Sequence, residues 1–113
     1  MAEVSICPRY HKAVELIGRR WNGAIVQALL AGSVRYNEIR AAVPDISDRM
    51  LAERLRELES EGVVARRVIP SAPVRVEYEL TEKGRALEEA VAAIARWAEQ
   101  WVALEAVPGA GAE

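Results

Sequence analysis

The sequence has few of the residues that build catalytic or metal centres. Its 113 residues include a single cysteine, Cys7, and a single histidine, His11. A lone cysteine cannot form an internal disulfide, no cysteine–histidine spacing matches a zinc site, and no phosphate-binding glycine loop is present. The sequence therefore predicts no cofactor and no metal. An enzyme would require a thiol dyad of Cys7 and His11, an alternative that lacks a third group.

Long apolar runs are also missing. No run approaches the roughly 20 residues that span a bilayer, and the first residues lack a basic start followed by an apolar core. We therefore expect a cytoplasmic protein with no membrane partner. Apolar residues make up 51% and charged residues 28%, which is typical of a globular domain. A chain this small buries only about two thirds of its unfolded surface, so a partner subunit would stabilise it.

The net charge of −2 is unusual for a nucleic-acid-binding protein, but its distribution is uneven. The segment from Arg9 to Arg75 contains 12 Lys/Arg and 8 Asp/Glu residues. The segment from Val76 to Glu113 contains 3 Lys/Arg and 8 Asp/Glu residues. A basic middle and an acidic end indicate that one face of the protein can meet phosphate. The overall acidity favours an alternative, a protein-interaction module that does not bind DNA.

Helical spacing predicts four helices in the first half, over residues 9–17, 22–31, 37–43 and 47–61. We expect Asn22, Asn37 and Ser47 to be N-caps and Gly62 to end the fourth helix in a left-handed conformation. That helix is the most regular one, with its apolar residues on one stripe. Members of the stripe are Leu51, Leu55 and Leu58.

After Gly62 the apolar period changes from 3.6 to 2. Residues 63–69 and 74–80 read as strands joined by a short proline-rich tip, and Thr81 should cap a final helix to about Leu104. Two short helices joined by a turn and followed by a hairpin predict a winged helix-turn-helix, an α+β fold that is mostly α with a C-terminal dimerisation helix. We expect this domain to span residues 9–105, between a flexible arm of residues 1–8 and a disordered tail of residues 106–113.

The outer face of the fourth helix is the candidate for reading DNA. With Leu51 in the core, a 100° step per residue turns Arg49 and Arg56 outward, where they can donate bidentate bonds to guanine. Glu53 can accept from a cytosine amine or orient an arginine, and the helix start suits a phosphate oxygen. The alternative is an ordinary solvated face. The predicted contact residues are Ser47, Asp48, Arg49, Ala52, Glu53 and Arg56.

Further arginines lie where a wing and a helix junction would meet the DNA backbone. Arg66, Arg67 and Arg75 flank the hairpin and could reach phosphates or the minor groove, although Arg75 could instead pair with nearby glutamates. Arg19 and Arg20, between the first two helices, are weaker candidates for phosphate contact, and the adjacent Trp21 is expected in the core.

The last helix repeats apolar residues at alternating steps of three and four, which is typical of a helix that packs against a partner helix. A surplus apolar stripe favours a homodimer, with the first helix contributing, and the alternative is that the helix folds back on its own domain. The predicted interface residues are Leu87, Val91, Ile94, Trp97, Trp101 and Leu104.

Cys7 stands directly before Pro8 at the start of the first predicted helix. A helix N-terminus and the nearby Arg9, His11 and Lys12 favour the thiolate, the form that reacts with oxidants and electrophiles. Cys7 is therefore a candidate redox sensor, and the alternative is an incidental small residue.

Three stretches resemble the HxlR family of bacterial winged-helix regulators. They are residues 46–64, residues 75–87 with Glu77-Tyr78-Glu79-Leu80-Thr81, and Arg35-Tyr36-Asn37-Glu38-Ile39, supported by Ile17-Gly18 and Arg20-Trp21. The resemblance implies a dimer joined through its terminal helices, two recognition helices for adjacent major grooves, and control of transcription. Some family members sense oxidants through a cysteine at the position of Cys7. Asn22 stands where the family often has threonine, and Ala65 where an acidic residue is common.

A symmetric dimer of this kind implies a near-palindromic operator in double-stranded DNA. Repression is the commoner outcome when a dimer covers a promoter, and activation stays open. A small-molecule effector is compatible with the sequence, but no residue pattern identifies one.

Overall fold

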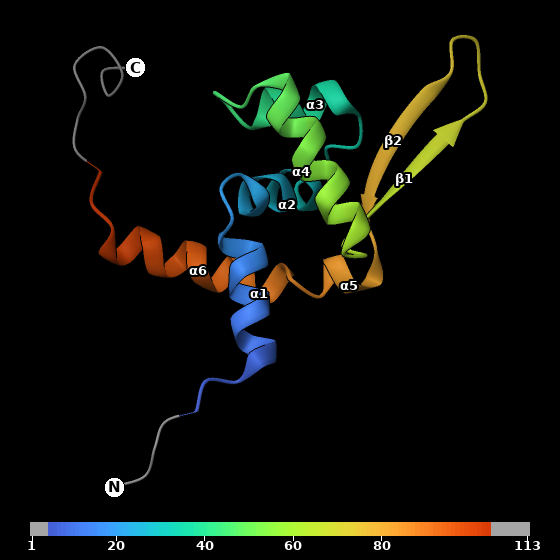
Figure 1. Cartoon of the computed structure of the whole chain (residues 1–113). Coiled ribbons are helices and arrows are strands. Elements are labelled where there is room, and N and C mark those ends of the chain that lie inside the picture. Colours follow the sequence, from blue (N-terminus) through green and yellow to red (C-terminus); the bar gives the residue numbers. More distant parts are fainter. Residues whose placement is uncertain (1–4, 105–113) are drawn as a thin grey trace, which may run out of the picture.

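The computed structural model describes residues 5–104. The predicted tail lies outside the described residues, and the predicted arm is described from residue 5 only. Pro8, the last residue of that arm, already belongs to the first helix. In chain order the elements are α1 (Pro8–Gly18), α2 (Asn22–Leu30), α3 (Tyr36–Ala42), α4 (Asp48–Ser60), β1 (Val64–Ile69), β2 (Arg75–Leu80), α5 (Glu82–Arg85) and α6 (Glu88–Trp101) (Figure 1).

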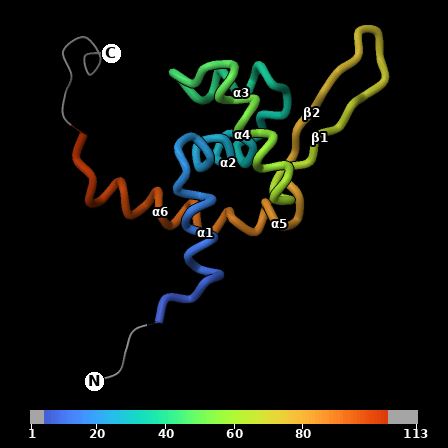
Figure 2. Tube along the Cα trace, in the orientation of Figure 1, coloured from blue at the N-terminus to red at the C-terminus, as the bar shows by residue number. Residues whose placement is uncertain are grey.

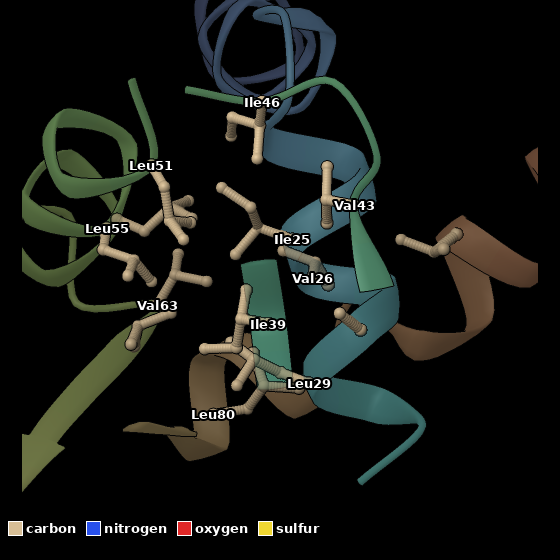
Figure 3. Close-up of a cluster of buried hydrophobic side chains, with 14 residues drawn as sticks. Ile25, Val26, Leu29, Ile39, Val43, Ile46, Leu51, Leu55, Val63 and Leu80 are labelled. Carbon is tan, nitrogen blue, oxygen red and sulfur yellow. The ribbon is translucent and has the colours of Figure 1, made fainter. Parts of the chain in front are cut away.

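The core lies where α2, α3 and α4 meet the base of the hairpin (Figure 3). The predicted leucine stripe of α4 is confirmed, since Leu51 and Leu58 are fully buried and Leu55 is 2% exposed. Ile39 of α3 and Val43, directly after α3, are also buried in this core. Because the leucine face of α4 is buried, the opposite face of the helix is the one that can contact a partner molecule.

Two predicted caps and one predicted helix end are confirmed. The Ser47 hydroxyl accepts a hydrogen bond from the Met50 N–H at 3.0 Å, and the Thr81 hydroxyl accepts one from the Gly84 N–H at 3.1 Å. Gly62 has a φ of 77°, the left-handed conformation that lets the chain turn from α4 into β1.

The other two predicted caps are wrong. Asn22 is the first residue inside α2, fully buried, and the capping position belongs to Trp21 at a φ of 81°. Asn37 lies inside α3, and Arg35 has the capping position. The N–H groups of Val34 and Arg35, just before the helix, donate to the Glu38 carboxylate at 3.0 and 2.9 Å. The Asn22 side chain instead donates to the Leu16 carbonyl oxygen and the Glu57 carboxylate, whereas the neighbouring Glu38 holds the start of α3.

The sequence predicts one continuous final helix, and this prediction is wrong. The helix breaks at residues 86–87. Gly84 is buried in α5, where a Cβ would collide with the Val63 carbonyl oxygen and crowd Leu80. This close packing holds α5 against the hairpin base, and the chain restarts as α6, which packs on α2. Leu104 follows the end of α6 at Trp101.

The hairpin pairs β1 and β2 antiparallel, from Val64 opposite Leu80 to Ile69 opposite Arg75. A hydrogen bond of 2.7 Å from the Tyr78 N–H to the Val34 carbonyl oxygen ties β2 to the link between α2 and α3. Figure 2 shows the hairpin projecting from one side of the helical body and α6 from the other. Within the described residues, no helix is long and apolar enough to cross a membrane.

Candidate nucleic-acid interface

The outer face of α4 is open to solvent, as the sequence predicted. The Arg49 side chain is 90% exposed, and Arg56 is exposed on the same face. Ala52 and Glu53 are half-buried between them. The Glu53 carboxylate lies 3.6 Å from the Arg49 Nε, one turn along the same helix. This face combines an accessible cation with a neighbouring acceptor, as required for reading base edges.

The N-terminal end of α4 is fixed by α3 through contacts that the sequence analysis missed. The Tyr36 hydroxyl donates to the Asp48 carbonyl oxygen at 2.9 Å, and an Arg40 guanidinium nitrogen lies 3.1 Å from the Asp48 carboxylate. Burial, and next the Asp48 charge, raise the pKa of the Tyr36 phenol above its ordinary 10.0. The sequence signal for these contacts is that Tyr36 and Arg40 both lie on α3, the helix that precedes the turn into α4. Asp48 is therefore engaged within the protein, whereas Ser47 caps the helix.

The two faces of the hairpin differ in charge pairing. On one face Arg67 lies 3.3 Å from Glu79 and 3.9 Å from Glu77, and Arg75 lies 3.8 Å from Glu77. The sequence also allows this pairing of Arg75 with a glutamate, as the alternative to a phosphate contact, and the structure contains it. Arg66 is on the other face, opposite Tyr78. All three arginines are exposed, so phosphate can reach each of them.

Arg66 and Arg56 line a common groove of about 420 Å³ between the hairpin and α4. Tyr36 and Tyr78 line the same groove, together with Glu59. The arrangement brings one arginine of the predicted recognition helix and one of the predicted wing to a single depression. Guanidinium and phenol groups are donors that phosphate oxygens accept from.

Arg19 and Arg20 already have partners inside the chain. An Arg19 guanidinium nitrogen lies 3.2 Å from the Glu57 carboxylate, and the Arg20 guanidinium stacks 4.7 Å from the centre of the Trp21 ring. Trp21 packs against the core, as predicted. Its left-handed φ is a strained conformation for a bulky residue, which the surrounding contacts must hold in place.

The predicted interface stripe divides into two parts. Val91 is 8% exposed within the core, and Leu87 packs against the same core, so both are covered by their own domain. The remaining members lie on the surface, with Trp97 60% and Trp101 66% exposed. Other exposed apolar residues on the stripe and on or beside α1 are Ile94, Leu104, Ile6, Tyr10 and Val14. The two terminal helices thus carry apolar surface that the single chain does not cover.

Cys7 occupies the N-cap position of α1 and is exposed. Its carbonyl oxygen accepts a hydrogen bond from the His11 N–H at 3.0 Å, and its side chain makes no capping bond. The His11 imidazole lies 3.6 Å from the Glu15 carboxylate on the next turn. The thiol is therefore accessible to a reagent in solution.

An exposed arginine face on the second helix of a helix-turn-helix, followed by a two-stranded wing, defines a winged-helix DNA-binding domain. Comparison with known proteins agrees with this class. A sequence model of the HxlR-like helix-turn-helix family matches residues 16–106. The chain belongs to this family, and it is a DNA-binding transcriptional regulator rather than an enzyme.

Two similar proteins are regulators of Bacillus subtilis strain 168. The chain is 52% identical over 102 residues to the uncharacterized HTH-type transcriptional regulator YvaP, covering 90% of this chain and 94% of that protein. It is 46% identical over 97 residues to the HTH-type transcriptional regulator YodB, covering 86% and 87%.

Solved structures of similar regulators have the same fold. The reduced form of YodB superposes with a TM-score of 0.78 at 46% identity, covering 87% of this chain and 96% of that chain. The redox regulator HypR in its oxidized form superposes with a TM-score of 0.79 at 40% identity, covering 87% and 100%. These likenesses confirm the winged fold that the sequence predicted.

Proposed function

We propose that this regulator binds a near-palindromic DNA operator as a homodimer in the cytoplasm and represses transcription there. The observation that carries the proposal is the amphipathic division of α4, in which a fully buried leucine row leaves Arg49 90% exposed on the opposite face. A helix placed in this way can enter a major groove, with its N-terminal outer residues at the base edges.

Each group of arginines has a distinct role in the proposal. Arg49 and Arg56 bind base edges, whereas Arg66 binds phosphate from the groove beside α4. Arg67 and Arg75 exchange their glutamate partners for phosphates of the neighbouring backbone, which makes their contribution sensitive to salt. The full set of proposed contact residues is Ser47, Asp48, Arg49, Ala52, Glu53 and Arg56 on α4, Arg66, Arg67 and Arg75 on the wing, and Arg19 and Arg20 at the α1–α2 turn.

The proposed dimer joins the uncovered apolar surfaces of α1 and α6, with Trp97 and Trp101 at its centre and Ile94 and Leu104 beside them. Two-fold symmetry would set the two α4 helices about 34 Å apart, one turn of the duplex. In this arrangement Leu87 and Val91 support α6 from within each protomer.

Cys7 is the proposed site of response to oxidants or electrophiles. The similar structures include YodB in reduced, diamide-treated and quinone-bound forms, and HypR is described as a redox regulator. In this chain the exposed thiol at the start of α1, beside the proposed dimer surface, supports the same role. Its oxidation or alkylation would alter the position of α1 and thereby the affinity for DNA.

The test is selection of bound duplexes from a random pool, run with and without diamide, followed by mobility-shift titration of the selected site. We expect an inverted repeat, a stoichiometry of two chains per duplex, and a change in affinity with diamide that Cys7→Ser abolishes. Recovery of no shared motif would contradict sequence-specific binding. An equal response to diamide in the Cys7→Ser variant would contradict the sensing role alone.

A further inference from the structure

A polar cluster joins the α1–α2 turn to the middle of α4. At its centre is the Glu57 carboxylate, which one guanidinium nitrogen of Arg19 approaches to 3.2 Å and one of Arg54 to 3.8 Å. The Asn22 side-chain amide donates to the same carboxylate at 3.3 Å. Glu57 therefore has three polar partners, two of which come from outside its own helix.

The same groups also bind the backbone on the other side of the junction. The Asn22 amide donates to the Leu16 carbonyl oxygen at the end of α1 at 2.8 Å, and the Arg54 Nε donates to the Arg20 carbonyl oxygen at 3.1 Å. The Arg54 side chain is only 13% exposed. The cluster thus connects the last turn of α1, the turn after it and α4, and it runs from the fully buried Asn22 to the 54% exposed side chain of Arg19.

This cluster is not the arrangement that stability alone would favour. Asn22 is fully buried, and its side-chain oxygen has no hydrogen-bond partner in the described part of the chain. The adjacent Trp21 has a left-handed φ of 81°. An apolar residue at position 22 would avoid an unsatisfied buried oxygen, so a role in positioning is the better explanation of the polar cluster.

The elements that the cluster joins have different tasks in the proposed function. Figure 1 shows α2 at the centre of the helical body, with α3 and α4 on one side and α1 and α6 on the other. The dimer surfaces are on α1 and α6, and the DNA-reading face is on α4. A rotation of α4 relative to α1 within each protomer would change the separation and phase of the two recognition helices in the dimer.

We infer that Glu57 is a positioning residue that fixes α4 relative to α1 and so sets the half-site spacing that the dimer accepts. The inference rests on the proposed binding of a dimer to an inverted repeat. Glu57 does not reach the bases itself. Its ties to Arg19 and Asn22 hold the angle between the dimer surface and the recognition helix, so they decide which operators two recognition helices can bind together.

The test is the affinity of wild type and Glu57→Gln for the selected operator and for versions with one or two base pairs added or removed at its centre. Because each base pair rotates one half-site by about a tenth of a turn, wild type should bind the altered spacings weakly. In Glu57→Gln we expect this preference to shrink by about fivefold or more, the lower range of coupling between distant sites. Affinity for an isolated half-site should change no more than it does in the control variant Glu59→Gln.

Glu59→Gln is the matched control, since it makes the same change of charge on the same helix away from the α1–α2 turn. The loss of a negative charge can raise the affinity for every operator, but this gain cancels when affinities for different half-site spacings are divided by one another. Glu59→Gln should therefore keep the wild-type preference among spacings. Arg19→Gln breaks the cluster from its exposed end, and it should flatten the profile even if Glu57→Gln does not fold.

The outcomes separate the inference from the proposed function. A wild-type protein that binds all spacings equally would overturn the proposed dimer on an inverted repeat. A steep wild-type profile that is unchanged in Glu57→Gln and in Arg19→Gln would overturn the positioning role. Melting temperatures of all variants, measured in parallel, show whether a flattened profile reflects partial unfolding, which would also count against the inference.

Discussion

Truncation of Trp97 to alanine should dissociate the proposed dimer. Trp97 is 60% exposed, and a tryptophan presents about 250 Å², so roughly 150 Å² per protomer is available for burial in an interface. At about 25 cal/mol per Å² this area is worth about 4 kcal/mol, and a two-fold interface contains it twice. If only a third of the area is buried, the loss is still roughly 2.5 kcal/mol, which corresponds to an increase of about 70-fold in the dimer Kd.

Sedimentation velocity over a concentration series measures this change directly. Arg96→Ala is the matched control, because a 100° step per residue places Arg96 on the opposite side of α6 from the apolar stripe. We expect the dimer of this control variant to have the same Kd as the wild-type dimer. A Trp97→Ala protein with the wild-type dimer Kd and an unchanged melting temperature would show that the α6 surface is not the interface.

Three further predictions concern α4 and α3. Arg49→Ala should cost about 1–3 kcal/mol per half-site on the selected operator and relax the preference at one base pair, and equal losses on random duplex would contradict base reading. Ser47→Ala removes the bond to the Met50 N–H and should lower the free energy of unfolding by about 1 kcal/mol in urea titration, whereas no change would exclude a capping role. Two backbone N–H groups lower the pKa of Glu38 below its ordinary 4.5. The folded-state pKa is thus below the unfolded one, so this stabilisation is present above pH 4.5 and is lost as the pH falls through the folded value. When the pH is lowered, the urea concentration at the unfolding midpoint should therefore fall less in Glu38→Gln than in wild type. An equal fall in the two proteins would contradict a stabilising role for the Glu38 carboxylate.

The sequence was sufficient wherever a short-range pattern determines the structure. The leucine row of α4 follows from apolar spacing, and Gly62 and the Ser47 and Thr81 caps follow from backbone requirements that few residue types meet. These local signals place α4 and the wing, so the exposed face with Arg49 could be predicted. The family resemblance rests on the same positions.

The patterns failed where a side chain has a choice of partners. An asparagine before a helical run is an ordinary capping signal, yet Asn22 reaches Leu16 and Glu57 instead. The apolar period of the last helix could not distinguish burial within one chain from burial between two. Val91 satisfies the period but belongs to the core, and Leu87 packs against it partly buried, whereas Ile94 and the stripe residues after it leave surface for a partner.

The Glu57 cluster shows why polar sites are harder to predict than apolar ones. Apolar spacing identifies the buried side of α4, but polar residues on its flanks give no sign of which one meets another element. The bond between Asn22 and Glu57 joins residues 35 positions apart. Directly before Asn22, Trp21 has a positive φ, a conformation that tryptophan seldom adopts and that the sequence does not signal. Measuring the half-site spacing that Glu57→Gln accepts therefore tests the angle between α1 and α4, which depends on tertiary contacts and not on local sequence patterns.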